Sequence, residues 1–157
     1  MKSTVFFLII TGVFFQNRQD IGFNIISFYP QLPKHHIDIT INNLKGTTGL
    51  IRIGIFTSET GYPDKPAINY SLAKDTLKSG KLRLIIPVDK PCEISISVLD
   101  DENKNGEMDY KFGIMPKEGF GFSNNPKVAS RKAPPFNKTS FQFAGGEKKI
   151  DINMVYM

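Results

Sequence analysis

A chain of 157 residues, 40% hydrophobic and 22% charged, can bury the core of one domain without help from disulfide bonds. Its formal net charge is +5, but acidic and basic residues are interspersed and no basic run with interleaved aromatic residues occurs, so no nucleic-acid partner is expected. A weak attraction to anionic surfaces fits this charge, and a mixed, solvated surface is the simpler interpretation. The lone cysteine, Cys92, excludes an internal disulfide and is expected in a strand or the core.

Residues 1–22 have the pattern of a secretory signal or leader. Lys2 supplies a positive start, Val5–Phe15 is an apolar run, and polar residues from Gln16 onward end it. The run is too short for a transmembrane helix, so no stable membrane span is expected. Export to the periplasm or the extracellular space is predicted, with an uncleaved anchor or a cytosolic core segment as alternatives.

Residues 23–36 are predicted to be a linker, and residues 37–157 a single domain of short strands. Ile37–Ile41 alternates strictly between apolar and polar residues, which is typical of a half-buried strand. Leu50–Phe56 is expected to form a hairpin with it, and Thr57–Ser71 is expected to be a loop. Further extended segments are predicted at Ser71–Ser79, Leu82–Ile86, Ile94–Val98, Thr139–Phe143 and Ile150–Tyr156.

Between the expected strands Ile94–Val98 and Thr139–Phe143, the segment Tyr110–Phe136 is rich in Gly and Pro and is predicted to be irregular. Irregular stretches of this length inside a compact domain are more often functional than accidental. No helix is predicted, although a short helix is the alternative to extended structure for Ser71–Ser79. The pattern indicates an all-β fold, an antiparallel β-sandwich of about seven strands with an immunoglobulin-like or transthyretin-like shape.

The most informative motif is Asp101–Asp109, which reads D-E-N-K-N-G-E-M-D. It carries oxygen-bearing side chains at its first, third and fifth positions, and a glycine at the sixth permits a sharp turn. A hard cation such as calcium requires this arrangement of oxygen ligands. The candidate metal ligands are Asp101, Asn103, Asn105, the carbonyl of Glu107, and Asp109, either directly or through water.

This acidic loop departs from an EF-hand, because Phe112 stands where a bidentate Glu belongs and strands rather than helices flank it. A further carboxylate would be needed, for which Glu118 and Asp100 are candidates. The expected affinity is weak, roughly 10⁻⁴ to 10⁻³ M as in extracellular modules. The alternative is a plain polar turn around Asn105–Gly106, a dipeptide that favours type I′ hairpins.

A second candidate segment runs from Glu118 to Asn125. Its two glycines allow unusual backbone angles and its two phenylalanines can anchor it on the core, while Ser123, Asn124 and Asn125 can cap backbone groups or bind a polar ligand. Three interpretations stay open: a structural loop packed on the acidic loop, a groove for a glycan or peptide, and an active site. The third would pair Glu118 with Asp109 or Asp101, as in glycoside hydrolysis.

Other catalytic arrangements find no support in the chain. The only histidines, His35 and His36, are adjacent and would point to opposite sides of an extended segment, which makes a poor chelating pair. No G-x-S-x-G elbow and no phosphate-binding glycine loop is present.

The acidic loop, the segment Phe112–Asn125 and the short run Ala133–Phe136 (A-P-P-F) together resemble the bacterial domain-of-unknown-function family 2141. The resemblance covers about Ile37–Met157. It implies an exported β-domain without an assigned activity.

These observations predict an exported, monomeric binding or accessory module of the cell envelope with a structural calcium-type loop. Its partner would be an envelope ligand, with a glycan or a peptide as candidates. The alternative is a small cell-envelope hydrolase acting on a glycan or peptide through Glu118 and a loop aspartate, and a purely structural surface protein is a third reading. Calcium is the only cofactor predicted.

Overall fold

The computed structural model describes residues 31–74, 77, 79–128 and 132–157. The predicted leader, residues 1–22, and residues 23–30 of the predicted linker lie outside this range. The described residues form an all-β protein, as predicted. Its elements are β1 (His36–Asn42), β2 (Leu50–Phe56), β3 (Ile68–Ala73), β4 (Leu82–Pro87), β5 (Cys92–Asp101), β6 (Tyr110–Lys111), β7 (Met115–Pro116), β8 (Gly119–Phe122), α1 (Phe136–Thr139), β9 (Phe141–Phe143) and β10 (Glu147–Asn153).

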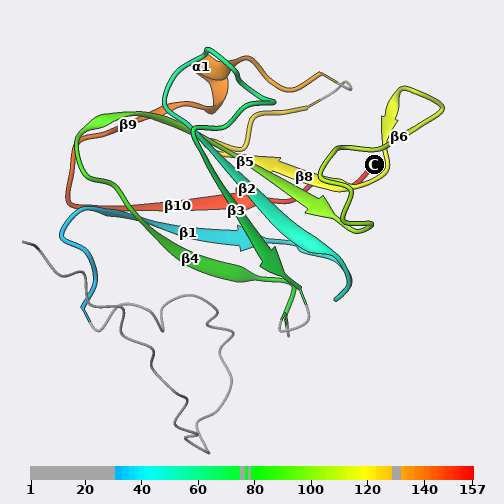
Figure 1. The fold of residues 1–157 in the computed structure, drawn as a ribbon, viewed down its shortest axis with the longest axis horizontal. Helices are drawn as coiled ribbons and strands as arrows, with labels where there is room; N and C mark the ends of the chain where they lie inside the picture. Colours follow the sequence, from blue (N-terminus) through cyan, green and yellow to red (C-terminus); the bar gives the residue numbers. More distant parts are fainter. Residues whose placement is uncertain (1–30, 75–76, 78, 129–131) are drawn as a thin grey trace, which may run out of the picture.

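The described strands form a three-stranded sheet of order β10-β1-β4 and a larger sheet of order β3-β2-β5-β8, in which β9 also pairs with β5. In Figure 1, the strands of the smaller sheet lie across those of the larger one. β6 and β7 form a separate two-stranded ribbon. The β1–β10 pair is parallel, which was not expected, whereas β1 and β4 run antiparallel.

The two larger sheets share one hydrophobic core within the described part of the chain. Alternate residues of a strand point to the same face, so each apolar alternation found in the sequence becomes one row of core side chains. The rows are Ile37, Ile39 and Ile41 in β1, Ile51, Ile53 and Ile55 in β2, Leu82, Leu84 and Ile86 in β4, and Ile94, Ile96 and Val98 in β5, all at most 3% exposed.

The predicted hairpin between Ile37–Ile41 and Leu50–Phe56 is wrong. β1 pairs with β10 and β4, while β2 pairs with β3 and β5, so the two strands lie in different sheets. The connection between them turns through positive backbone φ angles at Asn43 (63°), Gly46 (63°) and Gly49 (94°). Alternation identifies the buried face of a strand, but it contains no information about which strand lies beside it.

The segment expected to be irregular, Tyr110–Phe136, contains the three short strands β6, β7 and β8. β3 begins inside the predicted loop Thr57–Ser71, because the I-N-Y-S-L run from Ile68 alternates and packs Tyr70 and Leu72 against the core. The four-residue helix α1 was not predicted either. Among the residues described, no helix is long and apolar enough to cross a membrane.

The core predicts a sharp contrast between two isoleucines. Ile96 is fully buried in β5, and Ile96→Ala should lower the free energy of unfolding by about 2–5 kcal/mol through lost burial and an unfilled cavity. Ile114 is 63% exposed, and Ile114→Ala should change it by no more than about 0.5 kcal/mol. Urea unfolding of both variants measures the difference. Equal losses would contradict this description of the core.

Candidate functional site

Two adjacent carboxylates end β5 and point in opposite directions, because successive side chains alternate across a strand. Asp100 is fully buried, and its Oδ1 lies 2.6 Å from the Nζ of Lys74. Its Oδ2 accepts a hydrogen bond of 2.6 Å from the Tyr156 hydroxyl. Burial and the neighbouring Asp100 raise the pKa of Tyr156 above its ordinary value, so this hydroxyl remains a donor. Asp100, a candidate extra metal ligand, therefore already has partners on both oxygens.

Asp101 is also fully buried, but it lies on the other side of the strand. The Nε of Arg52 donates to its Oδ2. The backbone N–H groups of Asn105 and Gly106 donate to its two oxygens at 3.1 and 3.0 Å. Asp101 therefore closes the acidic loop upon itself, and Arg52 offsets its charge.

The remaining predicted ligands of the acidic loop also come together. The Oδ1 atoms of Asn103 and Asn105 accept backbone N–H groups two residues ahead, at 3.0 and 2.9 Å. Both amide nitrogens point at Oδ2 of Asp109, at 2.6 and 3.3 Å. Glu107 is exposed, and its N–H serves as one of these donors.

These groups already satisfy one another, so an oxygen-liganded cation would have to displace their hydrogen bonds. The side-chain oxygens of Asn103 and Asn105 accept backbone N–H groups and their amide nitrogens donate to Asp109, and turning either amide would set donor against donor and acceptor against acceptor. Because Arg52 neutralises Asp101, a cation in the loop would gain less attraction than two free carboxylates would give. No group of three or more His, Cys, Asp or Glu side chains within the described ranges is placed to hold a metal. The calcium role of the loop stays a prediction.

Glu118 connects β8 to the acidic loop. It is only 4% exposed, and its two oxygens accept the backbone N–H groups of Glu102 at 3.0 Å and Asp109 at 3.3 Å. Burial raises the pKa of its carboxyl, and the two backbone donors oppose that rise. Because both oxygens of Glu118 accept backbone N–H groups, the contacts favour a structural role in which Glu118 holds the acidic loop in place. No observation favours its hydrolytic role.

Ser123, Asn124 and Asn125 fasten the end of β8 to its surroundings. Ser123 Oγ accepts the N–H of Ile96 in β5 at 2.9 Å and donates to the carbonyl of Thr139 at 2.5 Å. The Nδ2 of Asn124 donates to the carbonyl of Ser140 at 2.7 Å, and the side chain of Asn125 bonds to the backbone of β10 twice, both at 2.8 Å. Ser123 is fully buried, whereas the two asparagines are exposed and have positive φ angles of 62° and 46°. Their use by a ligand stays a prediction.

The glycines of β8 do not provide unusual backbone angles, contrary to expectation. They allow close packing instead: a Cβ on Gly119 would lie 2.3 Å from the ring of Tyr156, and a Cβ on Gly121 would lie 2.7 Å from Ile152. Glycine inside a strand often marks such close approach. These contacts place the Tyr156 hydroxyl where it reaches Asp100.

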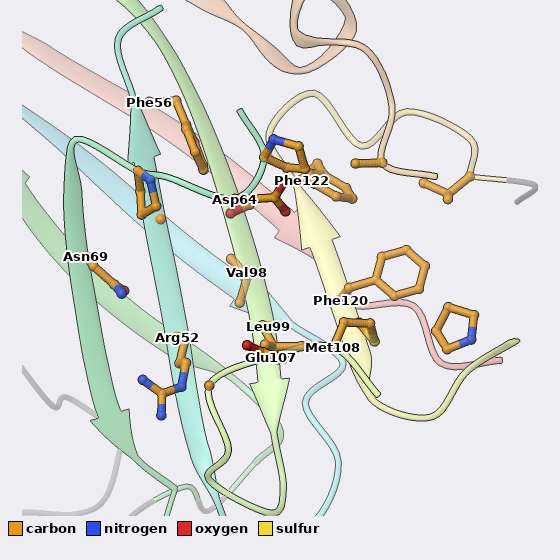
Figure 2. Close-up of a pocket in the computed structure, with 18 of the residues that line it drawn as sticks. Arg52, Phe56, Asp64, Asn69, Val98, Leu99, Glu107, Met108, Phe120 and Phe122 are labelled. Atoms are coloured by element: carbon orange, nitrogen blue, oxygen red, sulfur yellow. The ribbon is translucent and has the colours of Figure 1, made fainter. Parts of the chain in front are cut away.

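A groove of about 710 Å³ lies on the face of the larger sheet that points away from the core (Figure 2). We call it the outer-face groove. Gly54, Asn69 and Ser97 lie along it, on strands β2, β3 and β5. In Figure 2, Phe56 and Phe122 lie toward one end, and Arg52, Glu107 and Met108 toward the other.

The groove depends on Gly54, in the middle of β2. A Cβ there would lie 3.0 Å from Oγ of Ser97 and 3.1 Å from the ring of Phe56, so any side chain would intrude into this space. Phe56 is held by an edge-on contact with Tyr62, with ring centroids 5.0 Å apart. At the other end, residues 106–108 of the acidic loop form part of the lining.

Sequence reasoning missed most of this surface. Gly54 inside a predicted strand was the available signal, since such glycines often mark close approach of another group. Nothing in the sequence pointed to Lys74 or Arg52, whose partners lie 26 and 49 residues away along the chain.

Fold and site together define a small all-β protein with an amphipathic surface groove and a hydrogen-bonded acidic loop at one end of it. Residues 39–151 match the family described as "Uncharacterized protein conserved in bacteria (DUF2141)", and the chain belongs to that family. The resemblance seen in the motifs is thereby confirmed. No curated protein and no solved structure matches the chain.

Glu118 predicts a pH dependence of stability. Its pKa in the folded protein exceeds the ordinary 4.5, so the folded state holds the proton more tightly than the unfolded state does. The stabilisation is complete below pH 4.5 and is lost as pH rises through the elevated pKa. Glu118→Gln should flatten this decline, measured by urea unfolding between pH 4.5 and neutrality.

Exposed Glu107 in the same region supplies the control, since Glu107→Gln should leave the decline unchanged. The hydrogen bonds from Arg83 hold the pKa of Asp38 below 3.8, so Asp38 titrates outside this interval. A decline that persists in Glu118→Gln would rule out Glu118 as its source.

Proposed function

We propose that this protein is an exported binding or accessory module of the bacterial cell envelope that acts as a monomer. In this proposal the outer-face groove holds the ligand, and the acidic loop, stabilised by calcium, forms one end of it. The fold would be a β-sandwich of immunoglobulin-like or transthyretin-like type, in keeping with two sheets that share one core. Export rests on the apolar run Val5–Phe15 and its polar end.

The outer-face groove is the observation that carries the proposal. Its volume of about 710 Å³ falls within the range of small-ligand sites, roughly 300–1,000 Å³. Of the aromatic residues in its lining, Phe122 is partly exposed whereas Phe56 and Phe120 are buried, and Asn69, Ser97 and Arg52 offer hydrogen-bonding groups. Glycans and extended peptides both combine apolar faces with regularly spaced polar groups, so they are the ligand classes that suit this lining.

The acidic loop would serve the groove through rigidity. Residues 106–108 line the groove, and residues 101–109 are held mostly by hydrogen bonds within the loop itself. A cation held by Asn103, Asn105 and Asp109, with Asp101 behind them, would order this end further. The hydrolase alternative gains no comparable support, because Glu118 does not line the groove and both its oxygens accept backbone N–H groups.

The calcium part of the proposal predicts a shift in thermal stability. Ligand binding to the folded state alone stabilises it by about 1.4 kcal/mol at a tenfold excess over Kd and about 2.7 kcal/mol at a hundredfold excess. With a Kd of roughly 10⁻⁴ to 10⁻³ M, calcium at about 10 mM gives such an excess and should raise the melting temperature relative to chelator. Asp109→Ala should remove the shift, and Glu107→Gln should keep it, because only the carbonyl of Glu107 is a candidate ligand.

Arg52→Gln tests the electrostatics of the same loop. Removing the guanidinium frees the charge of Asp101, so this variant should be less stable in chelator but show a larger calcium shift than the original chain. Identical melting temperatures with and without calcium in all four proteins would leave the loop as a polar turn.

The groove part of the proposal predicts localised changes in an NMR titration with an N-acetylglucosamine oligosaccharide and, separately, an extended peptide. One probe should shift the amide signals of Gly54, Asn69 and Ser97. Asn69→Ala should weaken that probe by about two- to tenfold, the value of one hydrogen bond. Asn137→Ala, an exposed asparagine on α1, is the matched control. Shifts that avoid the groove for both probes would refute it as the ligand surface.

A further inference from the structure

The β6–β7 ribbon, residues 110–117, exposes an unusual amount of apolar surface. Eight large hydrophobic side chains are exposed among the described residues, and four of them fall within six consecutive positions of this ribbon. They are Tyr110 (40%), Phe112 (85%), Ile114 (63%) and Met115 (46%). Scattered exposed hydrophobic residues are ordinary, but a contiguous cluster marks an interaction surface.

The backbone directs this cluster outward. Phe112 has a φ of +54°, a conformation unfavourable for a bulky residue, and Gly113 follows with +70°. Apart from Gly113 and its two chain neighbours, no heavy atom lies within 4 Å of the position a Cβ would take on Gly113, so the tip borders open space. In Figure 1 the ribbon projects from the end of the molecule where the chain's carboxyl terminus lies.

The base of the ribbon, by contrast, is anchored. The N–H of Lys117 donates to the carbonyl of Asp109 at 2.9 Å, and Tyr110 pairs with Pro116 across the ribbon. Tyr110 and Pro116 also line the outer-face groove. The ribbon is thus a fixed support for an apolar tip.

The charges of the ribbon have one sign. Lys111 and Lys117 are exposed, and residues 110–117 contain no acidic residue. The Nζ of Lys111 lies 5.7 Å from the centre of the Phe112 ring, so a cation sits directly beside the most exposed aromatic side chain. An apolar tip flanked by cations matches the interface of an anionic bilayer, where acyl chains lie beneath negative headgroups.

We propose that the β6–β7 ribbon docks on an anionic phospholipid bilayer by inserting Phe112 and Ile114, with Lys111 and Lys117 at the level of the headgroups. A narrow projecting tip suits a deformable bilayer better than the flat surface of a protein. The acidic loop lies at the base, roughly 7–10 Å from the tip at the rise of a strand. That separation is about one Debye length, roughly 8 Å at physiological salt, so screening weakens the repulsion between the acidic loop and the headgroups without abolishing it.

The absence of tryptophan from the chain permits a site-specific test. Phe112→Trp places a single indole at the tip, and Leu32→Trp places one at a position 51% exposed outside the ribbon. Both full-length variants are titrated with vesicles of equal parts phosphatidylglycerol and phosphatidylethanolamine. Chelator is present throughout, so the result does not depend on cation binding by the acidic loop. A local readout is needed because the apolar run Val5–Phe15 can itself bind vesicles.

Insertion predicts that the emission of Phe112→Trp shifts to shorter wavelength and is quenched by brominated acyl chains, while Leu32→Trp is unchanged. Adding Ile114→Ser to Phe112→Trp should weaken partitioning roughly tenfold, since an aliphatic side chain no longer enters the bilayer. Adding Lys111→Gln and Lys117→Gln should weaken it on these vesicles but not on neutral phosphatidylcholine.

An unshifted indole in Phe112→Trp overturns the proposal, as does equal partitioning with and without Ile114→Ser. Sedimentation of the original chain and of Phe112→Ser, without vesicles, tests the competing role. If Phe112→Ser abolishes self-association while the tip indole remains unshifted by lipid, the ribbon is a protein-docking surface instead. Urea unfolding midpoints of all variants confirm that each is folded.

Discussion

Two neighbouring buried carboxylates at the end of β5 impose the main constraint on this structure. An ionised carboxylate away from water is strongly unfavourable unless a cation and hydrogen-bond donors meet it. Since Asp100 and Asp101 alternate across the strand, they need separate partners on opposite faces of the sheet. Lys74 and Tyr156 pair with Asp100. Arg52 and the backbone N–H of Asn105 pair with Asp101.

These partners draw distant parts of the chain to one place. Lys74 follows β3 and also donates to the carbonyl of Lys45 at 2.5 Å, which holds the connection between β1 and β2. The hydrogen bond from Tyr156 to Asp100 fixes the carboxyl-terminal residues against the sheet, and the ring of Tyr156 packs against β8 at Gly119, which has no side chain. Glu118 then ties the start of β8 to the backbone of the acidic loop. The groove end and the ribbon base are held by the same set of contacts.

The division of surfaces follows from the same geometry. On the larger sheet, one row of each strand is committed to the core, so the other row is available to line a groove. Because Gly54 has no side chain, this row leaves space for the outer-face groove, and aromatic residues of β2 and β8 flank it. The acidic loop carries the chain away from the sheet and into the ribbon, which sets an apolar tip apart from the groove.

The sequence by itself determined the all-β class, the positions of most strands and the presence of a tight acidic turn, because period-two alternation and glycine-asparagine chemistry act over a few residues. It also determined family membership through motifs that are contiguous in the chain. Only the tertiary structure decided that β1 and β2 lie in different sheets, that β1 pairs in parallel with β10, and that Gly119 of β8 lies against an aromatic ring. Strand partners and ion-pair partners are chosen between segments far apart in sequence, and no local pattern encodes that choice. The groove belongs to the same category, since it exists only where several strands and loops that are distant in sequence meet.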